Sequence, residues 1–232
     1  EDALRKWVLA LDLEGQVPHV LDIDQSVWHR GGVLWWNALM LRHIMRPNNW
    51  LQEQLRAARN LVGLHHPIIG MHVRQGDACN DWSRPAACPP LSRYVDAAKE
   101  MRAQYGVSTI FLATDSADVV TALQKEDNFT ILTLAGLDRG LFDSNLYIEF
   151  RVQMKLVDRR AVTHSSFLDL MLLSECDSLI GTLSSAFSAV ALELSFANKG
   201  YMPPYISLDI PWRPFRPFSP YPGLSMQHLP RA

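Results

Sequence analysis

The chain has 232 residues, enough for one large domain or for one domain and part of another. Hydrophobic residues make up 48% and charged residues 20%, which is an ordinary globular composition. The net charge of -2 argues against binding to bulk nucleic acid or anionic membranes, and no segment has the apolar length of a membrane span. The sequence begins without Met, so we expect a processed or truncated piece of a longer protein.

Apolar spacing predicts two helices, followed by an alternation of strands and helices. The first helix covers 24–46 and stops before Pro47, and the second begins near Asn48 or Asn49. Strands are expected at 67–73, 108–113, 129–134, 178–181 and 199–206, and helices at 92–105 (capped by Ser92), 116–125, 164–175 and from 184 onward. Residues 135–162 have no clear period and are assigned only as a loop followed by a stretch with helical character. The alternation predicts an α/β fold with a Rossmann-like, doubly wound parallel sheet.

We expect three parts along the chain. Residues 1–62 form the helical end of a preceding lobe, 63–206 form the Rossmann-like domain, and 207–232 form an extended tail rich in proline.

The strand at 67–73 is apolar without alternation, which indicates burial on both faces of a parallel sheet. Its end carries His72, Arg74 and Asp77, and ligands of open α/β sheets bind at the carboxyl ends of strands. The guanidinium of Arg74 suits a phosphate because its planar fork binds two oxygens at once. The alternative is a structural ion pair between Arg74 and Asp77.

Three further positions are candidates for ligand binding. Ser184 and Ser185 follow a strand and begin a helix, where unpaired N–H groups bind anions such as diphosphate; the alternative is simple N-capping. Asp169 lies on a largely apolar helix face and could accept two donors from one edge of guanine; the alternative is a salt bridge to Arg159 or Arg160. Asp115 also ends a strand, or else it caps the next helix.

The sequence does not support a metal site or any of the common nucleotide-binding motifs. The pair His65–His66 precedes a strand and lacks a companion acid, so we expect no metal site there. The sequence contains no P-loop, no Gly-x-Gly-x-x-Gly and no Gly-x-Ser-x-Gly elbow.

Together these segments resemble the α1,6-fucosyltransferase superfamily, which includes the animal N-glycan core enzyme and bacterial nodulation-factor enzymes. Residues 69–77 (Ile-Gly-Met-His-Val-Arg-Gln-Gly-Asp) resemble its first motif, and 111–115 (Phe-Leu-Ala-Thr-Asp) resemble the second. Residues 168–177, followed by Thr-Leu-Ser-Ser at 182–185, resemble the third. Upstream similarity includes Trp35-Trp36, Ile44-Met45-Arg46-Pro47 and Trp50-Leu51, so order and spacing agree over roughly 25–197.

The resemblance implies a GT-B glycosyltransferase that uses GDP-fucose as donor, with no cofactor and no metal. Arg74 would hold the β-phosphate and offset the charge that develops as GDP leaves. His72 and Asp169 would recognise guanine. The remaining donor-binding positions would be Asp77, Asp115, Ser184 and Ser185. The acceptor would be a glycan or glycoprotein hydroxyl, attacked with inversion in the Golgi or another secretory-pathway lumen.

Several departures from the family pattern keep a second hypothesis open. Gln75 replaces a second Arg, Ala78 replaces a basic residue, and Ser116 replaces a second acid. The family's loop acid aligns with Trp82, so we expect the adjacent Asp81 to be the base, with Asp77 as second choice. Most of the first lobe precedes residue 1, and a missing lobe or a partner chain would have to supply it; no SH3-like domain follows. The alternative function is a catalytically silent relative with a structural or binding role.

Cys79 and Cys88 lie close together in the irregular loop 74–90. We expect them to form a disulfide if the protein matures in the secretory pathway, because the bond would fix the loop beside the predicted phosphate site. The alternative is two reduced thiols in a cytosolic protein.

Overall fold

The protein is described here from a computed structural model that covers residues 25–76, 79, 88–134, 139, 142 and 146–212, with side chains from residue 34 onward. Its strands form one five-stranded parallel sheet in the order β3-β2-β1-β4-β5. They are β1 (Ile69–Val73), β2 (Thr109–Thr114), β3 (Thr130–Leu132), β4 (Ser178–Gly181) and β5 (Tyr205–Ser207). The predicted doubly wound α/β fold is therefore confirmed, and the strand order reverses between β1 and β4.

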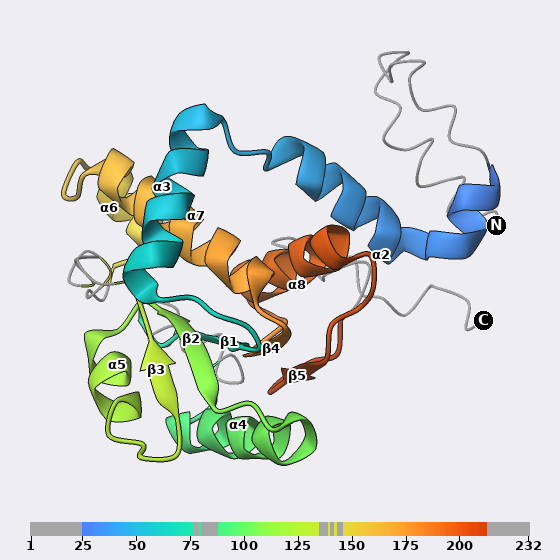
Figure 1. Ribbon diagram of the computed structural model, residues 1–232. Helices are drawn as coiled ribbons and strands as arrows, with labels where there is room; N and C mark the ends of the chain where they lie inside the picture. The colour runs from blue at the N-terminus through green and yellow to red at the C-terminus, as the bar shows by residue number, and fades with distance from the viewer. Residues whose placement is uncertain are drawn as a thin grey trace, which may run out of the picture.

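Helices cover both faces of this sheet (Figure 1). Helices α4 (Leu91–Tyr105) and α5 (Ala117–Leu123) lie on one face, and α7 (Arg159–Glu175) and α8 (Ala186–Lys199) lie on the other. The short helix α6 (Ile148–Gln153) precedes α7. Two helices come before the sheet: α2 (Gln25–Ile44) packs along α8, and α3 (Asn49–Val62) packs against α7.

Local sequence signals set most helix ends. Asn48 caps α3 through its side chain, and Gly63 ends the helix with a φ of 68°, a conformation that glycine adopts without strain. The expected cap at Ser92 is wrong, because α4 begins one residue earlier with Pro90 at its N-cap and no side-chain hydrogen bond. Helix α7 begins at Arg159, earlier than expected, because the side chain of Asp158 caps it.

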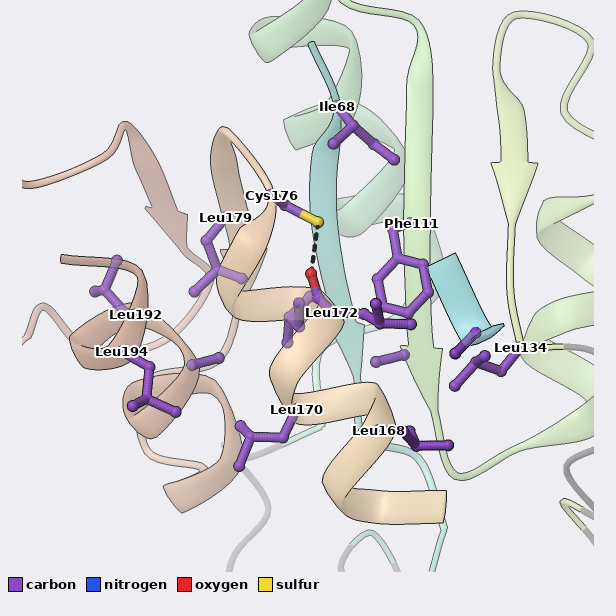
Figure 2. Packing of buried hydrophobic residues seen from close by; sticks show 14 of the residues in the cluster. Ile68, Phe111, Leu134, Leu168, Leu170, Leu172, Cys176, Leu179, Leu192 and Leu194 are labelled. Carbon is purple, nitrogen blue, oxygen red and sulfur yellow. Dashed lines mark hydrogen bonds between the residues drawn. The ribbon is translucent and has the colours of Figure 1, made fainter. Parts of the chain in front are cut away.

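The strands bury alternate side chains in two apolar layers, one on each face of the sheet. Ile69, Met71 and Val73 of β1 pack with residues of α4 and α5. Phe111 and Ala113 of β2 pack with the leucines of α7 and α8 (Figure 2). Burial on both faces explains why β1 and β2 read as unbroken apolar runs.

The contact between α7 and β1 depends on a glycine. A Cβ atom at Gly70 would lie 2.9 Å from both the Cβ of Cys176 and a methyl carbon of Leu173. Only a residue without a side chain lets the end of α7 approach the strand this closely. Figure 2 shows Cys176 at that end of the helix.

The expected last strand at 199–206 is much shorter in the structure, since pairing with β4 involves only Tyr205, Ile206 and Ser207. Lys199 belongs to the end of α8 instead, and Gly200 ends that helix. Within the described part of the chain, no helix is both long and apolar enough to cross a membrane.

Candidate functional site

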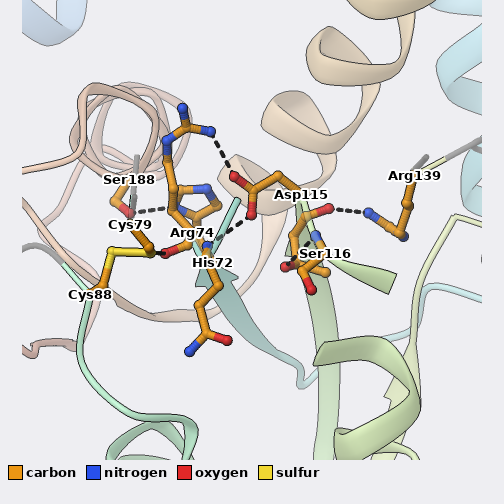
Figure 3. A network of polar contacts seen from close by, with 10 residues as sticks. His72, Arg74, Cys79, Cys88, Asp115, Ser116, Arg139 and Ser188 are labelled. Atoms are coloured by element: carbon orange, nitrogen blue, oxygen red, sulfur yellow. Dashed lines mark hydrogen bonds and ion pairs between the residues drawn. A yellow bond between two sulfur atoms is a disulfide. The ribbon is translucent and has the colours of Figure 1, made fainter. Parts of the chain in front are cut away.

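The candidate site lies at the carboxyl ends of the strands, beside the point where the strand order reverses. His72 and Arg74 come from the end of β1, and Asp115 directly follows β2 (Figure 3). Strand β4 leads through Thr182 to the start of α8. The sheet therefore brings together residues that are more than a hundred positions apart in the sequence.

Asp115 organises the end of β1. Its Oδ2 atom accepts a hydrogen bond from Arg74 Nη1 at 2.8 Å, and its Oδ1 atom accepts one from the backbone N–H of Gln75 at 2.9 Å. Asp115 is only 9% exposed, whereas the Arg74 side chain is 27% exposed. Arg74 is thus held in place by a buried acid while part of its side chain stays exposed. Asp115 caps no helix, because Ser116 caps α5.

Gly76 is required by the same packing. A Cβ atom at this position would lie 2.7 Å from Asp115 Oδ2, the atom that binds Arg74. The glycine after Arg-Gln therefore makes room for the acid that holds the arginine.

His72 is a neutral, buried imidazole. Its Nδ1 atom lies 2.6 Å from Ser188 Oγ on α8, and its ring stacks on Phe187 with centroids 4.6 Å apart. Burial, together with the charge of Arg74, lowers the pKa of His72 to about 3. The residue can therefore offer hydrogen bonds and a flat apolar face near neutral pH, but no charge.

Cys79 and Cys88 form a disulfide, as predicted. Their sulfur atoms lie 3.4 and 3.9 Å from the backbone carbonyl oxygen of Arg74. The bond therefore restrains the loop that follows β1 next to the backbone of Arg74. The predicted site residues Asp77 and Asp81 lie outside the described residues.

Asp169 on α7 is 7% exposed and faces Arg139 across 3.8 Å. Its Oδ1 atom is buried without a hydrogen-bond partner among the described residues. Burial raises the pKa of this carboxyl to about 7, although the charge of Arg139 opposes the shift. The expected alternative partners, Arg159 and Arg160, are exposed at the start of α7, so that interpretation is wrong.

The start of α8 is already occupied by an acid. The carboxylate of Asp209 accepts hydrogen bonds from the backbone N–H groups of Leu183, at 2.9 Å, and Ser184, at 3.2 Å. Ser185 stands at the N-cap of α8, but its side chain makes no capping bond. Within the described residues, the two serines thus lie beside backbone donors that bind an internal anion.

Arg139 and Asp209 are two charged residues of the described site that the sequence did not indicate. Asp209 follows β5 by two positions, in a segment that the sequence analysis assigned to the extended tail from residue 207 onward. Arg139 lies between β3 and α6, where the sequence showed no period. No group of three or more His, Cys, Asp or Glu in the described ranges has the geometry of a metal site.

The sequence matches the family of alpha-(1,6)-fucosyltransferase N- and catalytic domains over residues 14–209. The chain belongs to this family. It is 27% identical to the alpha-(1,6)-fucosyltransferase of Drosophila melanogaster over 173 residues, which are 72% of this chain and 26% of that protein. The chain therefore spans about a quarter of that relative's length.

The chain is also similar to two solved fucosyltransferases at low identity. POFUT1 in complex with GDP is 13% identical with a TM-score of 0.43, over 70% of this chain and 48% of that one. NodZ from Bradyrhizobium is 21% identical with a TM-score of 0.42, over 70% of this chain and 45% of that one.

Proposed function

We propose that this chain is the donor-binding part of a fucosyltransferase, which moves fucose from GDP-fucose to a glycan hydroxyl. The observation that carries the proposal is Arg74, held by Asp115 at the strand-order reversal and partly exposed there. Family membership supports the same class of reaction. Relatives point to the donor: POFUT1 was crystallised with GDP and with GDP-fucose, and NodZ was soaked with GDP-fucose.

In this proposal the donor lies across the crevice. The diphosphate meets Arg74, Ser184 and Ser185, and guanine lies toward His72 and Asp169. The bond between fucose C1 and the β-phosphate oxygen breaks while the acceptor oxygen bonds to C1 from the opposite face, which inverts the anomeric carbon. Arg74 offsets the negative charge gained by GDP, which is a form of electrostatic stabilisation that needs no metal.

The hydroxyl proton must go to a base on the acceptor side. We keep Asp81 as the proposed base and Asp77 as second choice. The acceptor surface would come from a preceding GT-B lobe, of which residues 1–62 form the end, or from a partner chain. A disulfide beside the site supports a secretory-pathway lumen, including the Golgi, as the location.

A catalytically silent relative is the second candidate function. The observation that favours it is the Asp209 carboxylate at the start of α8, where a diphosphate would otherwise meet the helix N-terminus. The neutral Gln75 in place of a second arginine also favours a silent relative, because the replacement removes a cation from the donor site.

Calorimetry with GDP, GDP-fucose, UDP and ADP tests the donor assignment. We expect GDP and GDP-fucose to bind more tightly than UDP and ADP. Equal affinity for GDP and UDP would reject guanine recognition. A transfer assay on a longer form that includes the preceding lobe then separates the two candidates, because a silent relative binds GDP and transfers no fucose.

A further inference from the structure

Arg139 joins three elements at the edge of the candidate site. Its guanidinium donates a hydrogen bond to the backbone carbonyl of Thr114, the last residue of β2 (Figure 3). It donates a second one to Oγ1 of Thr133, which follows β3. The residue is 8% exposed. A buried arginine with two such bonds has a fixed position, because its planar fork matches both acceptors at once.

The third element is α7, through Asp169. Arg139 Nη1 lies 3.8 Å from Asp169 Oδ2, and both side chains are almost fully buried. A buried carboxylate without a compensating charge takes up a proton, since the interior solvates the ion poorly. Within the described residues, Arg139 is the charged group that acts on the pKa of Asp169.

Two features set this pair apart from a purely structural salt bridge. Buried ion pairs that stabilise a fold have their remaining lone pairs satisfied, whereas Oδ1 of Asp169 has no hydrogen-bond partner among the described residues. Arg139 also binds the carbonyl of Thr114, which directly precedes Asp115, the acid that holds Arg74. The pair therefore leaves one acceptor open and is coupled through one peptide unit to the proposed phosphate-binding arginine.

We propose that Arg139 is a positioning residue for nucleobase recognition, which favours the ionised form of the Asp169 carboxyl and leaves Oδ1 to accept donors from the guanine edge. This inference rests on the proposed function for its ligand. Guanine presents two neighbouring N–H donors, which need an ionised acceptor. Uracil presents one, so loss of Arg139 acts on GDP and leaves UDP unaffected.

The test compares Arg139→Gln, which removes the charge and keeps an N–H donor, with Arg139→Lys, which keeps the charge. Arg160→Gln is the matched control, because Arg160 is exposed on α7. The first measurement is the carboxyl titration of Asp169 by carbon NMR in the ligand-free chain, assigned with Asp169→Asn. The second is the affinity for GDP and for UDP, measured by calorimetry at about pH 6 and about pH 8.

We expect Arg139→Gln to raise the pKa of Asp169 by about one unit or more, the usual effect of a neighbouring arginine. GDP affinity should then fall about tenfold near pH 6 and recover toward pH 8, while UDP affinity stays constant. Arg139→Lys and Arg160→Gln should titrate like the parent chain. If Arg139→Gln does not fold, an Asp169 titration in Arg139→Lys that matches the parent supports the role of charge, and a shift of a unit or more rejects it.

The outcomes separate this inference from the proposed function. An unchanged Asp169 titration in folded Arg139→Gln rejects the inference, even if the parent prefers GDP. An equal loss of GDP and UDP affinity also rejects it, because the residue would then serve the phosphates or the fold. A parent chain that binds GDP and UDP equally overturns the guanine-binding function, and the role of Arg139 in nucleobase recognition with it.

Discussion

At the scale of single residues, the position of the Arg74 guanidinium depends on its contact with a buried acid. The sequence alone offered Asp77, which lies outside the described residues, as an ion-pair partner for Arg74. Among the described residues, Arg74 pairs with Asp115, 41 positions further along the chain. Gly76 is part of the same arrangement, because any side chain there would press on the acid. The motif around Arg74 is therefore explained by a contact with the neighbouring strand.

Replacing Arg74 tests the phosphate assignment. Arg74→Ala should weaken GDP binding by about 1.5–3 kcal/mol, the range for one hydrogen bond to a charged group. Calorimetry measures the change, and Arg93→Ala on the exposed face of α4 is the matched control. Binding as tight as that of the parent would show that Arg74 is only the ion-pair partner of Asp115.

Asp169 should make stability depend on pH. Its pKa is raised from 3.8 to about 7 in the folded chain, so the folded state holds a proton that the unfolded state loses. Stability therefore falls as pH rises from about 4 to about 7, and the loss reaches a few kcal/mol. Asp169→Asn should remove this slope in denaturant unfolding measured across that range. An identical slope in parent and variant would mean that Asp169 is ionised throughout.

At the scale of elements, Asp209 links the end of β5 to the start of α8. Its carboxylate accepts hydrogen bonds from Leu183, Ser184 and Ile210 backbone N–H groups, and from the hydroxyl of Ser207. This network closes the turn after β4 and stabilises the positive end of the helix. It also places a negative charge where the proposal puts a diphosphate.

Removing that charge should affect stability and binding in opposite directions. Asp209→Asn keeps one acceptor oxygen, so we expect a stability loss of only about 1 kcal/mol. GDP should bind about two- to fivefold more tightly, because the variant removes a like charge beside the helix start. Unfolding curves and calorimetry measure the two effects, with Asp127→Asn in an exposed turn as control. Weaker GDP binding would mean that Asp209 supports the donor site.

The elements that were predicted correctly from the sequence are those with strong local signals. Strands β1, β2 and β4 are continuous apolar runs, and their positions were correct within two residues. The site residues at their ends, Arg74 and Asp115, were found for the same reason. The bounds of α6 and the early start of α7 were not predicted, because 135–162 mixes charged and apolar residues without a period, and β5 is shorter than the strand expected at 199–206.

Long-range partners were beyond the reach of local patterns. Asp169 could be recognised as an acid on an apolar face, but its partner Arg139 lies 30 positions away in a stretch without regular spacing. Packing of α7 against β2 brings the two together. Neighbouring basic residues in the sequence, Arg159 and Arg160, suggested the wrong pair.

At the scale of the whole molecule, the described site residues lie at or near the carboxyl ends of the strands. The apolar layers on the two faces of the sheet are closely packed (Figures 1 and 2). In the loop after β1, the Cys79–Cys88 disulfide joins two described residues and lies next to the carbonyl oxygen of Arg74. Stability of the whole fold and order at the site are thereby connected through one covalent bond.

Reduction of this disulfide should weaken both properties. The bond closes a short loop, so its loss should lower the free energy of unfolding by roughly 2–3 kcal/mol at most. GDP affinity should fall as well, because the backbone at Arg74 loses its restraint. The remaining cysteine does not interfere, since Cys176 is buried and burial raises the pKa of its thiol.

Unfolding curves and calorimetry with and without reductant measure both effects. The double variant Cys79→Ser, Cys88→Ser is the control, because reductant should leave it unchanged. If reduction lowers stability without changing GDP affinity, the disulfide serves the fold alone and Arg74 is positioned by Asp115.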